Sequence, residues 1–156
     1  MSQTVTIPIN KADAIKRFEQ AAWKLARMLE QPKSVKQVWN LQADIEDTAD
    51  NGLMVASFEQ HLWEGVNLMG EYLASTPTYG TGQTASVFTI TLTMPSNWVI
   101  HSAPGLKYEI LELIHNGMMG DWLDDMKPDQ AATFKKKAEL SKAKIQSIVY
   151  SLNAPS

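Results

Sequence analysis

The residues with the clearest chemical potential are a carboxylate and an imidazole, Glu112 and His115, at Glu-x-x-His spacing. This spacing places both side chains on one helix face, as in di-iron helical bundles. Such bundles need a second copy of the motif and two further inward glutamates. His61 and Glu64 occur in the reverse order and do not complete the ligand set. We therefore predict no metal site and no cofactor, and we keep a helical metal-binding protein built on Glu112 and His115 as an alternative.

Enzyme motifs are absent from the remaining residues. The histidines His61, His101 and His115 do not neighbour a serine or aspartate in a nucleophile motif such as Gly-x-Ser-x-Gly. Gly80-x-Gly82 is too short for a dinucleotide fingerprint, and no Gly-Lys-Ser/Thr follows it. The chain has no cysteine, which excludes disulfides, thiolate metal sites and cysteine catalysis. We predict that the protein is not an enzyme.

Length and composition set the broad class. A chain of 156 residues with 44% hydrophobic and 20% charged residues is typical of one globular domain. No apolar run is long enough to cross a bilayer, and the N-terminus lacks the features of a signal peptide. The net charge of −3 argues against broad nucleic-acid binding. We expect one helical domain over residues 1–156, no membrane association, and contact with nucleic acid at most by proximity.

Charge is distributed unevenly along the chain. No lysine or arginine lies between Lys36 and Lys107, whereas this window holds seven acidic residues. Residues 1–36 contain seven basic and three acidic side chains. Two interpretations stay open: these are solvated faces of one monomer, or basic and acidic surfaces meet between copies of the chain.

Two segments have the period-two pattern of β-strands. Within residues 87–94, threonines alternate with apolar residues. The apolar residues would share one face of a strand: Phe88, Ile90, Leu92 and Met94. Residues 4–9 repeat this rhythm with Val5, Ile7 and Ile9. Because a lone strand leaves its backbone groups unpaired, we expect these two segments to pair in a two-stranded element.

The rest of the chain predicts helices separated by breaks. Asn10 is a candidate cap for a first helix that ends near Gln31, because Pro32 forbids continuation. Further helices are expected over about 53–74, about 105–123 with Ser102 as its cap, and about 128–152. Residues 33–52 would hold at most a short helix, and residues 75–86 a flexible polar loop. The predicted fold is mainly α, a four-helix bundle-like domain with a small β element.

Some residues are better explained by contacts with other molecules. Open strand edges accept a neighbour's strand, and tryptophans off the main apolar stripe are typical of interfaces. We expect strand addition either at Val5 and Ile7 or at Leu92 and Thr93. We expect side-chain contacts at Trp23, Trp98 and three lysines of the last helix, Lys135, Lys136 and Lys142.

The order of elements resembles a known group of proteins. A Thr-Val-Thr-Ile-Pro-Ile strand precedes the first helix, and the threonine-rich strand is followed by Pro95-Ser96-Asn97-Trp98. An apolar helix then ends in Gly120-Asp121-Trp122-Leu123. These features make the chain similar to small helical proteins from the structural gene modules of tailed phages and prophages of gut Bacteroidales.

The resemblance implies a non-enzymatic virion protein and supplies no catalytic residues. It implies a head–tail connector or neck (adaptor) subunit that forms a homo-oligomeric ring between portal-side and tail-side neck proteins. The location would be the virion, assembled in the host cytoplasm. A tail-completion or head-decorating protein is the alternative within this class. A cytosolic helical metal-binding or regulatory protein is the alternative from another class.

Overall fold

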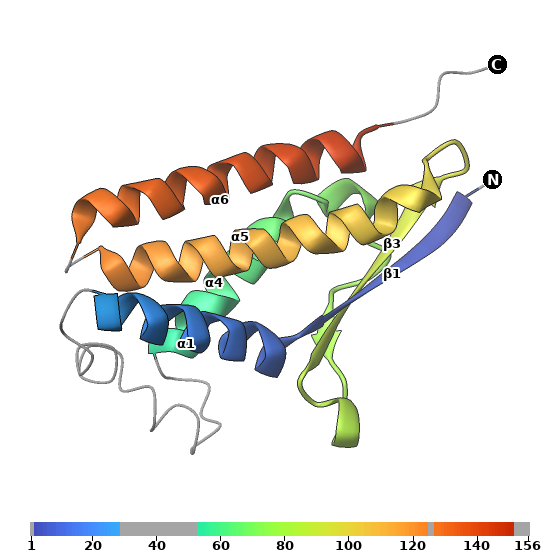
Figure 1. The fold of residues 1–156 in the computed structure, drawn as a ribbon. Coiled ribbons are helices and arrows are strands. Elements are labelled where there is room, and N and C mark those ends of the chain that lie inside the picture. Colours follow the sequence, from blue (N-terminus) through green and yellow to red (C-terminus); the bar gives the residue numbers. More distant parts are fainter. Residues whose placement is uncertain (1, 29–52, 125–126, 152–156) are drawn as a thin grey trace.

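The computed structural model describes residues 2–28, 53–124 and 127–151 (Figure 1). Long helices and a small sheet make up these residues, which confirms the mainly α class with a small β element. The elements are, in order, β1 (Ser2–Asn10), α1 (Lys11–Met28), α4 (Leu53–Asn67), η1 (Gly70–Tyr72), β2 (Thr78–Tyr79), η2 (Gly82–Thr84), β3 (Val87–Pro95), η3 (Ile100–Ser102), α5 (Ala103–Leu123) and α6 (Pro128–Val149). The short helix considered for residues 33–52 lies outside the described residues.

The sheet is antiparallel, with strand order β1-β3-β2. β1 pairs with β3 from Ser2↔Pro95 to Asn10↔Val87, which confirms the predicted pairing of the two threonine-rich segments. The third strand, β2, pairs with Phe88 and Thr89. It lies inside the segment 75–86 that we expected to be a loop. A strand of two residues is too short for a period-two pattern, so the sequence did not indicate it.

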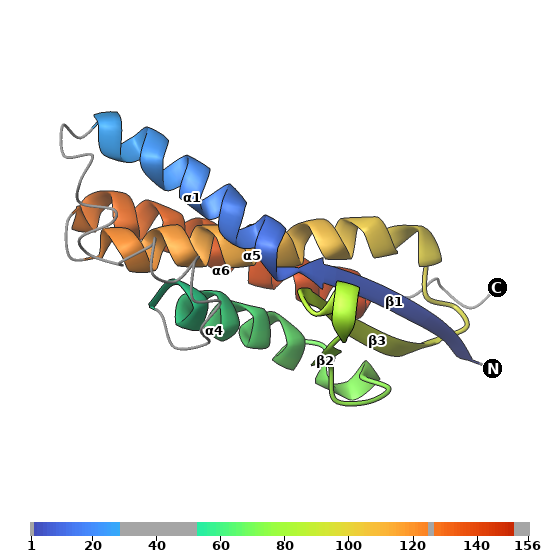
Figure 2. The same ribbon diagram turned by 90° about the horizontal axis from the view of Figure 1, so that it is seen from below.

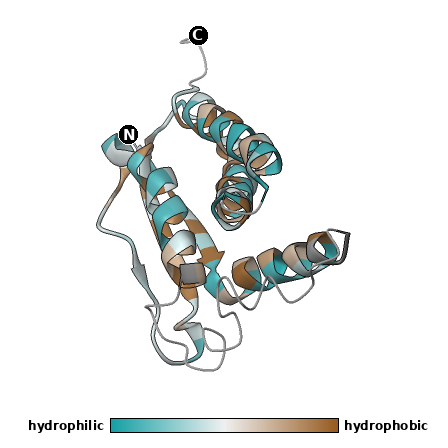
Figure 3. Ribbon diagram, turned by 90° about the vertical axis from the view of Figure 1, so that its left-hand side faces the viewer, coloured by the Kyte–Doolittle hydropathy of each residue, from teal (hydrophilic) through white to brown (hydrophobic). Residues whose placement is uncertain are grey.

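α5 is the central helix, as its apolar composition predicts. α6 packs along it in the opposite direction, α4 and α1 pack on its other sides, and its first turns cover the sheet (Figures 1 and 2). The apolar side chains of both long strands point toward the helices and are buried, among them Ile7, Ile9, Ile90 and Leu92. Figure 3 shows hydrophobic segments along these packed elements. One core therefore joins the helices to the sheet.

α1 begins where the sequence predicts. The Asn10 side-chain oxygen accepts a hydrogen bond from the backbone N–H of Asp13 at 3.1 Å, which is the expected cap. The inner face of α1 is buried, and the Phe18 ring meets the Trp122 ring of α5 edge to face at 6.3 Å. This contact fixes α1 against the second half of α5.

One predicted helix end is wrong, whereas Ser102 lies at the predicted N-cap position of α5 without a side-chain capping hydrogen bond. The helix expected over 53–74 ends at Asn67, and the chain tightens into η1. Leu73 then forms a bridge with Leu92, and the N–H of Ala74 donates to Thr91 O, so pairing with β3 replaces the last predicted turns. Ser102 does not cap α5 through its side chain, because it is already in the helical conformation as the last residue of η3.

Candidate assembly edge and buried ionic cluster

The outer edge of β1 is the first candidate for function. In an antiparallel pair, alternate residues direct both backbone polar groups toward the partner strand. The N–H of Lys11 donates to Ser86 O at 2.7 Å, one step beyond Asn10↔Val87, which assigns the odd-numbered residues of β1 to the side facing β3. The backbone groups of Thr4 and Thr6 therefore point away from the sheet. Pro8, which has no N–H to lose, lies in the same outward set.

This edge carries few of the features that normally protect an exposed strand. Natural edge strands are blunted by charged side chains, prolines, bulges or covering segments. No residue from Ser2 to Asn10 is charged, and Pro8 is the single proline. Thr4, Thr6 and Pro8 are exposed, and β1 forms the outer border of the sheet in Figures 1 and 2. A nine-residue strand thus has one side that pairs with no other described strand, and this side is suited to pairing with another chain.

The structure moves the predicted strand-addition site by one residue. Val5 and Ile7 are buried, at 4% and 1% exposure, and their backbone groups face β3, so neither offers a contact. Leu92 is fully buried in the central strand. Thr93 is exposed and is the residue of β3 that follows the Leu73–Leu92 bridge. It therefore lies at the edge of the sheet on the side opposite β1. Pro8 was the sequence signal for the outward set. A proline lacks an N–H and so occupies a position whose backbone faces away from the partner strand, and Thr4 and Thr6 alternate in step with Pro8.

Trp98 is an internal residue, contrary to the expectation of an interface. Its side chain is 3% exposed, and its indole N–H donates to Ile148 O at 2.9 Å. The Gln3 amide donates to Trp98 O at 2.7 Å and to Pro95 O at 2.9 Å. Trp98 therefore ties the end of the sheet to the end of α6. The loop position in the sequence gave no indication of this burial.

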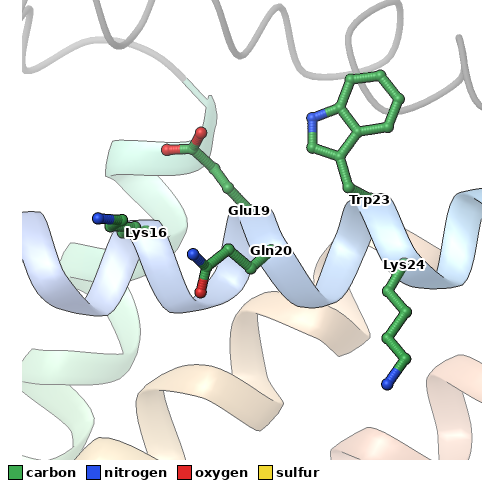
Figure 4. A pocket seen from close by; sticks show the side chains of 5 residues that line it. All are labelled: Lys16, Glu19, Gln20, Trp23 and Lys24. Carbon is green, nitrogen blue, oxygen red and sulfur yellow. The ribbon is translucent and has the colours of Figure 1, made fainter.

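Trp23 lies half-buried on the outer side of α1. Together with Lys16, Glu19, Gln20 and Lys24 it lines a hollow of about 690 Å³. Figure 4 shows Glu19 and Trp23 on one side of the helix and Lys24 on the other. Burial raises the pKa of Glu19 in spite of the opposing charge of Lys16. The hollow is a surface feature of α1 and does not gather a set of reactive groups.

The three predicted lysines of α6 have different roles. Lys135 pairs with Asp124 at 2.8 Å. Lys142 pairs with Glu64 of α4 at 2.6 Å and with Glu139 at 3.0 Å, and its pKa is raised, first of all by the hydrogen bond with Glu64. Lys136 is exposed and has no ion pair within the described part of the chain. Lys136 is thus the one of the three whose charge is available to a partner.

A partly buried ionic cluster, with His61 at its buried centre, joins α4, α5 and α6, and the sequence did not reveal it. His61 Nε2 lies 2.8 Å from Asp121 Oδ2, and His61 Nδ1 lies 2.5 Å from Glu64 Oε1. The hydroxyl of Ser57 donates to the same Asp121 oxygen at 2.6 Å. Glu64 continues the chain of contacts to Lys142. We call these five residues the His61 cluster.

The His61 cluster favours a charged imidazole. Burial, the largest single influence, acts to lower the pKa of His61, but the hydrogen bond and charge of Asp121 together with Glu64 outweigh it and raise this pKa. Burial likewise acts to raise the pKa of Asp121, and the hydrogen bonds from His61 and Ser57 outweigh it and lower this pKa. The two shifts have the signs of an ion pair.

Gly117 makes room for the His61 ring. A Cβ atom at this position would lie 2.4 Å from His61 Cγ and 2.5 Å from both Cδ2 and Nδ1. The imidazole thus packs directly on the backbone of α5. The Asp121 carboxylate is at the C-terminal end of the same helix, where the helix dipole disfavours an acid. That misplaced acid was the one sequence signal of a cationic partner.

The geometry of the His61 cluster does not match a nucleophile triad. Ser57 donates to Asp121 and not to His61, so the nucleophile–base hydrogen bond is missing from this cluster. The carboxylates of Glu64 and Asp121 contact opposite sides of the ring and do not converge on a common point. The arrangement can hold a proton on His61 and hold three helices together.

Glu112 and His115 have separate surroundings in the described part of the chain. Arg17 of α1 pairs with Glu112 at 2.7 Å. Burial, followed by the charge of Arg17, lowers the pKa of His115 to about 4, and its Nδ1 is buried without a hydrogen-bond partner. His115 also borders a small cavity of about 140 Å³ between α1 and α5. Among residues 2–28, 53–124 and 127–151, no group of three or more histidines and carboxylates is placed to bind a metal ion.

Comparison with known proteins does not assign the chain to a family. No family model, curated protein or solved structure matches it. Within the described residues, no helix is both long and apolar enough to cross a membrane. What defines the chain is therefore its architecture: a helical protein with a small antiparallel sheet, an open strand edge and an ionic cluster buried between helices.

Proposed function

We propose that this chain is a non-enzymatic structural subunit of a tailed-phage virion, a head–tail connector or neck (adaptor) protein that assembles into a ring. The observation that carries the proposal is the free edge of β1. Thr4 and Thr6 direct their backbone groups away from β3 along an uncharged, exposed strand. The resemblance of the sequence to structural-module proteins of Bacteroidales phages supports the same proposal.

A strand edge is a suitable contact for a ring. A ring needs two different surfaces on each subunit, so that each copy contacts the next by a head-to-tail arrangement. The edge of β1 can pair with any extended segment through backbone hydrogen bonds. The partner segment can therefore be a different part of the next copy. Lys136 of α6, which has no ion pair among the described residues, provides a further charge for a contact with an acidic partner.

The strength of one such contact is modest. Thr4 and Thr6 each offer one donor and one acceptor, and Pro8 adds an acceptor. At about 0.5–1.5 kcal/mol for each backbone hydrogen bond, the edge contributes on the order of 3–7 kcal/mol before the cost of association. Such a contact is weak between isolated subunits. It becomes effective when several copies and neighbouring proteins hold each other at high local concentration, as in a neck.

The same edge supports a tail-completion or head-decorating protein as the second candidate. The two candidates differ in their assembly. A neck subunit forms a closed ring with its own copies, whereas a completion or decorating protein uses the edge to bind a different virion protein. Portal-side and tail-side neck proteins are the expected partners of a ring.

The test blocks the edge without disturbing the pairing inside the sheet. Thr6→Pro removes an N–H that points away from β3, and an edge position tolerates proline. Thr6→Val keeps this N–H and serves as the matched control. We expect Thr6→Pro to reduce self-association, measured by multi-angle light scattering, while Thr6→Val and the wild type behave alike. Equal association of the two folded variants would refute the role of the edge.

A further inference from the structure

We propose that His61 is a proton-operated clamp, whose charged imidazole holds α4 against the α5–α6 pair and whose deprotonation releases α4. This inference goes beyond the proposed function and does not depend on it. It rests on the geometry around the imidazole, on the charges of the three helices that surround it, and on the absence of a side chain at Gly117.

The first argument is that both ring nitrogens contact carboxylate oxygens. The distances are 2.8 Å from Nε2 to Asp121 Oδ2 and 2.5 Å from Nδ1 to Glu64 Oε1. A neutral imidazole has one N–H, so its second nitrogen would present a lone pair to a carboxylate. The contact with Glu64 is not aligned as a hydrogen bond, which leaves charge attraction as its physical basis. A carboxylate oxygen at each ring nitrogen therefore favours the imidazolium form of His61.

The second argument is the balance of charges around the ring. α4 contributes Glu64, α5 contributes Asp121, and α6 contributes Lys142, which contacts Glu64. At the border of the cluster, Lys135 pairs with Asp124 and Lys142 pairs with Glu139. With His61 charged, the imidazolium lies between the two inner carboxylates, and Lys142 and Lys135 add positive charge on either side. Loss of the proton removes the cation between Asp121 and Glu64, whose side chains are 32% and 29% exposed.

The third argument is mechanical. The ring sits on the bare backbone of Gly117, so the contact between α4 and α5 at this point depends on keeping the imidazole in place. Ser57 is tied to the same Asp121 oxygen as His61, and Glu64 is tied to both His61 and Lys142. A change in the charge of the His61 ring therefore affects the contacts that both Ser57 and Glu64 of α4 make with α5 and α6.

The direct test follows the protonation of His61 in the intact protein. Nitrogen-15 NMR of the imidazoles distinguishes a ring with two N–H groups from either neutral tautomer. We expect the loss of one ring proton from His61 to have its midpoint above the ordinary imidazole pKa of about 6.5. A midpoint at or below this value would overturn the proposal.

The second test asks whether deprotonation releases α4 in particular. Amide hydrogen exchange is compared between the wild type and His61→Gln at each pH, so that the intrinsic exchange rate cancels. Each unit by which folding raises the pKa of one group changes the opening equilibrium by about tenfold. We expect α4 to be better protected in the wild type than in His61→Gln at a pH below the unfolded imidazole pKa of about 6.5, and this difference to fall as the pH rises through the folded pKa of His61. His101→Gln is the control.

Two results would contradict the clamp. The first is a protection difference that is independent of pH, because His61→Gln would then act through packing alone. The second is a difference that is equal in α4 and α1, because the effect would then be on global stability. Neither result depends on self-association, so failure of the clamp is separable from failure of the proposed assembly function.

Discussion

Substitution of Gly117 by alanine tests the packing of α4 on α5. The added Cβ would lie 2.4–2.5 Å from three ring atoms of His61, whereas ordinary contact begins near 3.4 Å. The ring must therefore move by about 1 Å, away from a position set by Asp121 and Glu64. Overpacking costs about 1–3 kcal/mol, and a weakened charged hydrogen bond about 1.5–3 kcal/mol. The higher helix propensity of alanine relative to glycine offsets this cost by about 1 kcal/mol.

We therefore expect Gly117→Ala to lower the free energy of unfolding by about 1.5–5 kcal/mol. The measurement is urea denaturation followed by circular dichroism, and the midpoint of thermal unfolding should fall by roughly 5–15 °C. Gly105→Ala is the matched control. It is also in α5, but its nearest contact would be Ile148 Cδ1 at 4.0 Å, so propensity alone should apply. We expect this control to be neutral or stabilising.

A double-mutant cycle identifies the cause. In a His61→Ala background the ring is gone, so Gly117→Ala should no longer destabilise the protein. If Gly117→Ala is as well tolerated as Gly105→Ala in the wild-type background, the close approach of α4 and α5 is wrong. If the cost of Gly117→Ala persists without the ring, His61 is not what the new methyl group meets.

Three further predictions follow from the same structure. The pKa of His61 is raised in the folded protein, so the stabilisation from its charge is complete below the unfolded pKa and is lost as the pH rises through the folded pKa. The urea midpoint of the wild type should therefore fall over this pH range. The midpoint of His61→Gln should not. The lowered pKa of Asp121 acts in the opposite direction, so its stabilisation is lost as the pH falls through the folded pKa; Asp121→Asn should cost about 1–2 kcal/mol at neutral pH and lower the pKa of His61 measured by NMR. Trp98→Phe keeps an aromatic ring but leaves Ile148 O without its donor, and should cost about 1–3 kcal/mol in urea denaturation, whereas Trp98→Ala should cost more.

The sequence predicted the elements whose patterns are long. Period-two alternation located both main strands, and the shared rhythm of residues 4–9 and 87–94 led to their pairing. Helical spacing and the Asn10 cap located α1. The end of α4 was wrong because the pairing of Leu73 and Ala74 with β3 overrides local helix propensity. This override is a tertiary effect and leaves no periodic signal in the chain.

The candidate site was less predictable than the fold. Alternation fixes which side chains are buried, but it does not tell which backbone groups face the partner strand, and so Val5 and Ile7 were chosen in place of Thr4 and Thr6. His61 and Asp121 are sixty residues apart, and their contact depends on how α4 crosses α5. The sequence showed only an acid at an unfavourable helix end. The Glu-x-x-His spacing made Glu112 a candidate metal ligand. In the structure Glu112 forms an ion pair with Arg17.

The central claim is that the chain is built to assemble with its own copies through the β1 edge. The most direct measurement is the native mass of the isolated 156-residue protein by multi-angle light scattering, across concentration and at low and high salt. The account predicts a discrete oligomer, a fixed multiple of the 17.4 kDa chain, that forms as concentration rises and is weaker for Thr6→Pro. A monomer at every concentration and salt would contradict it.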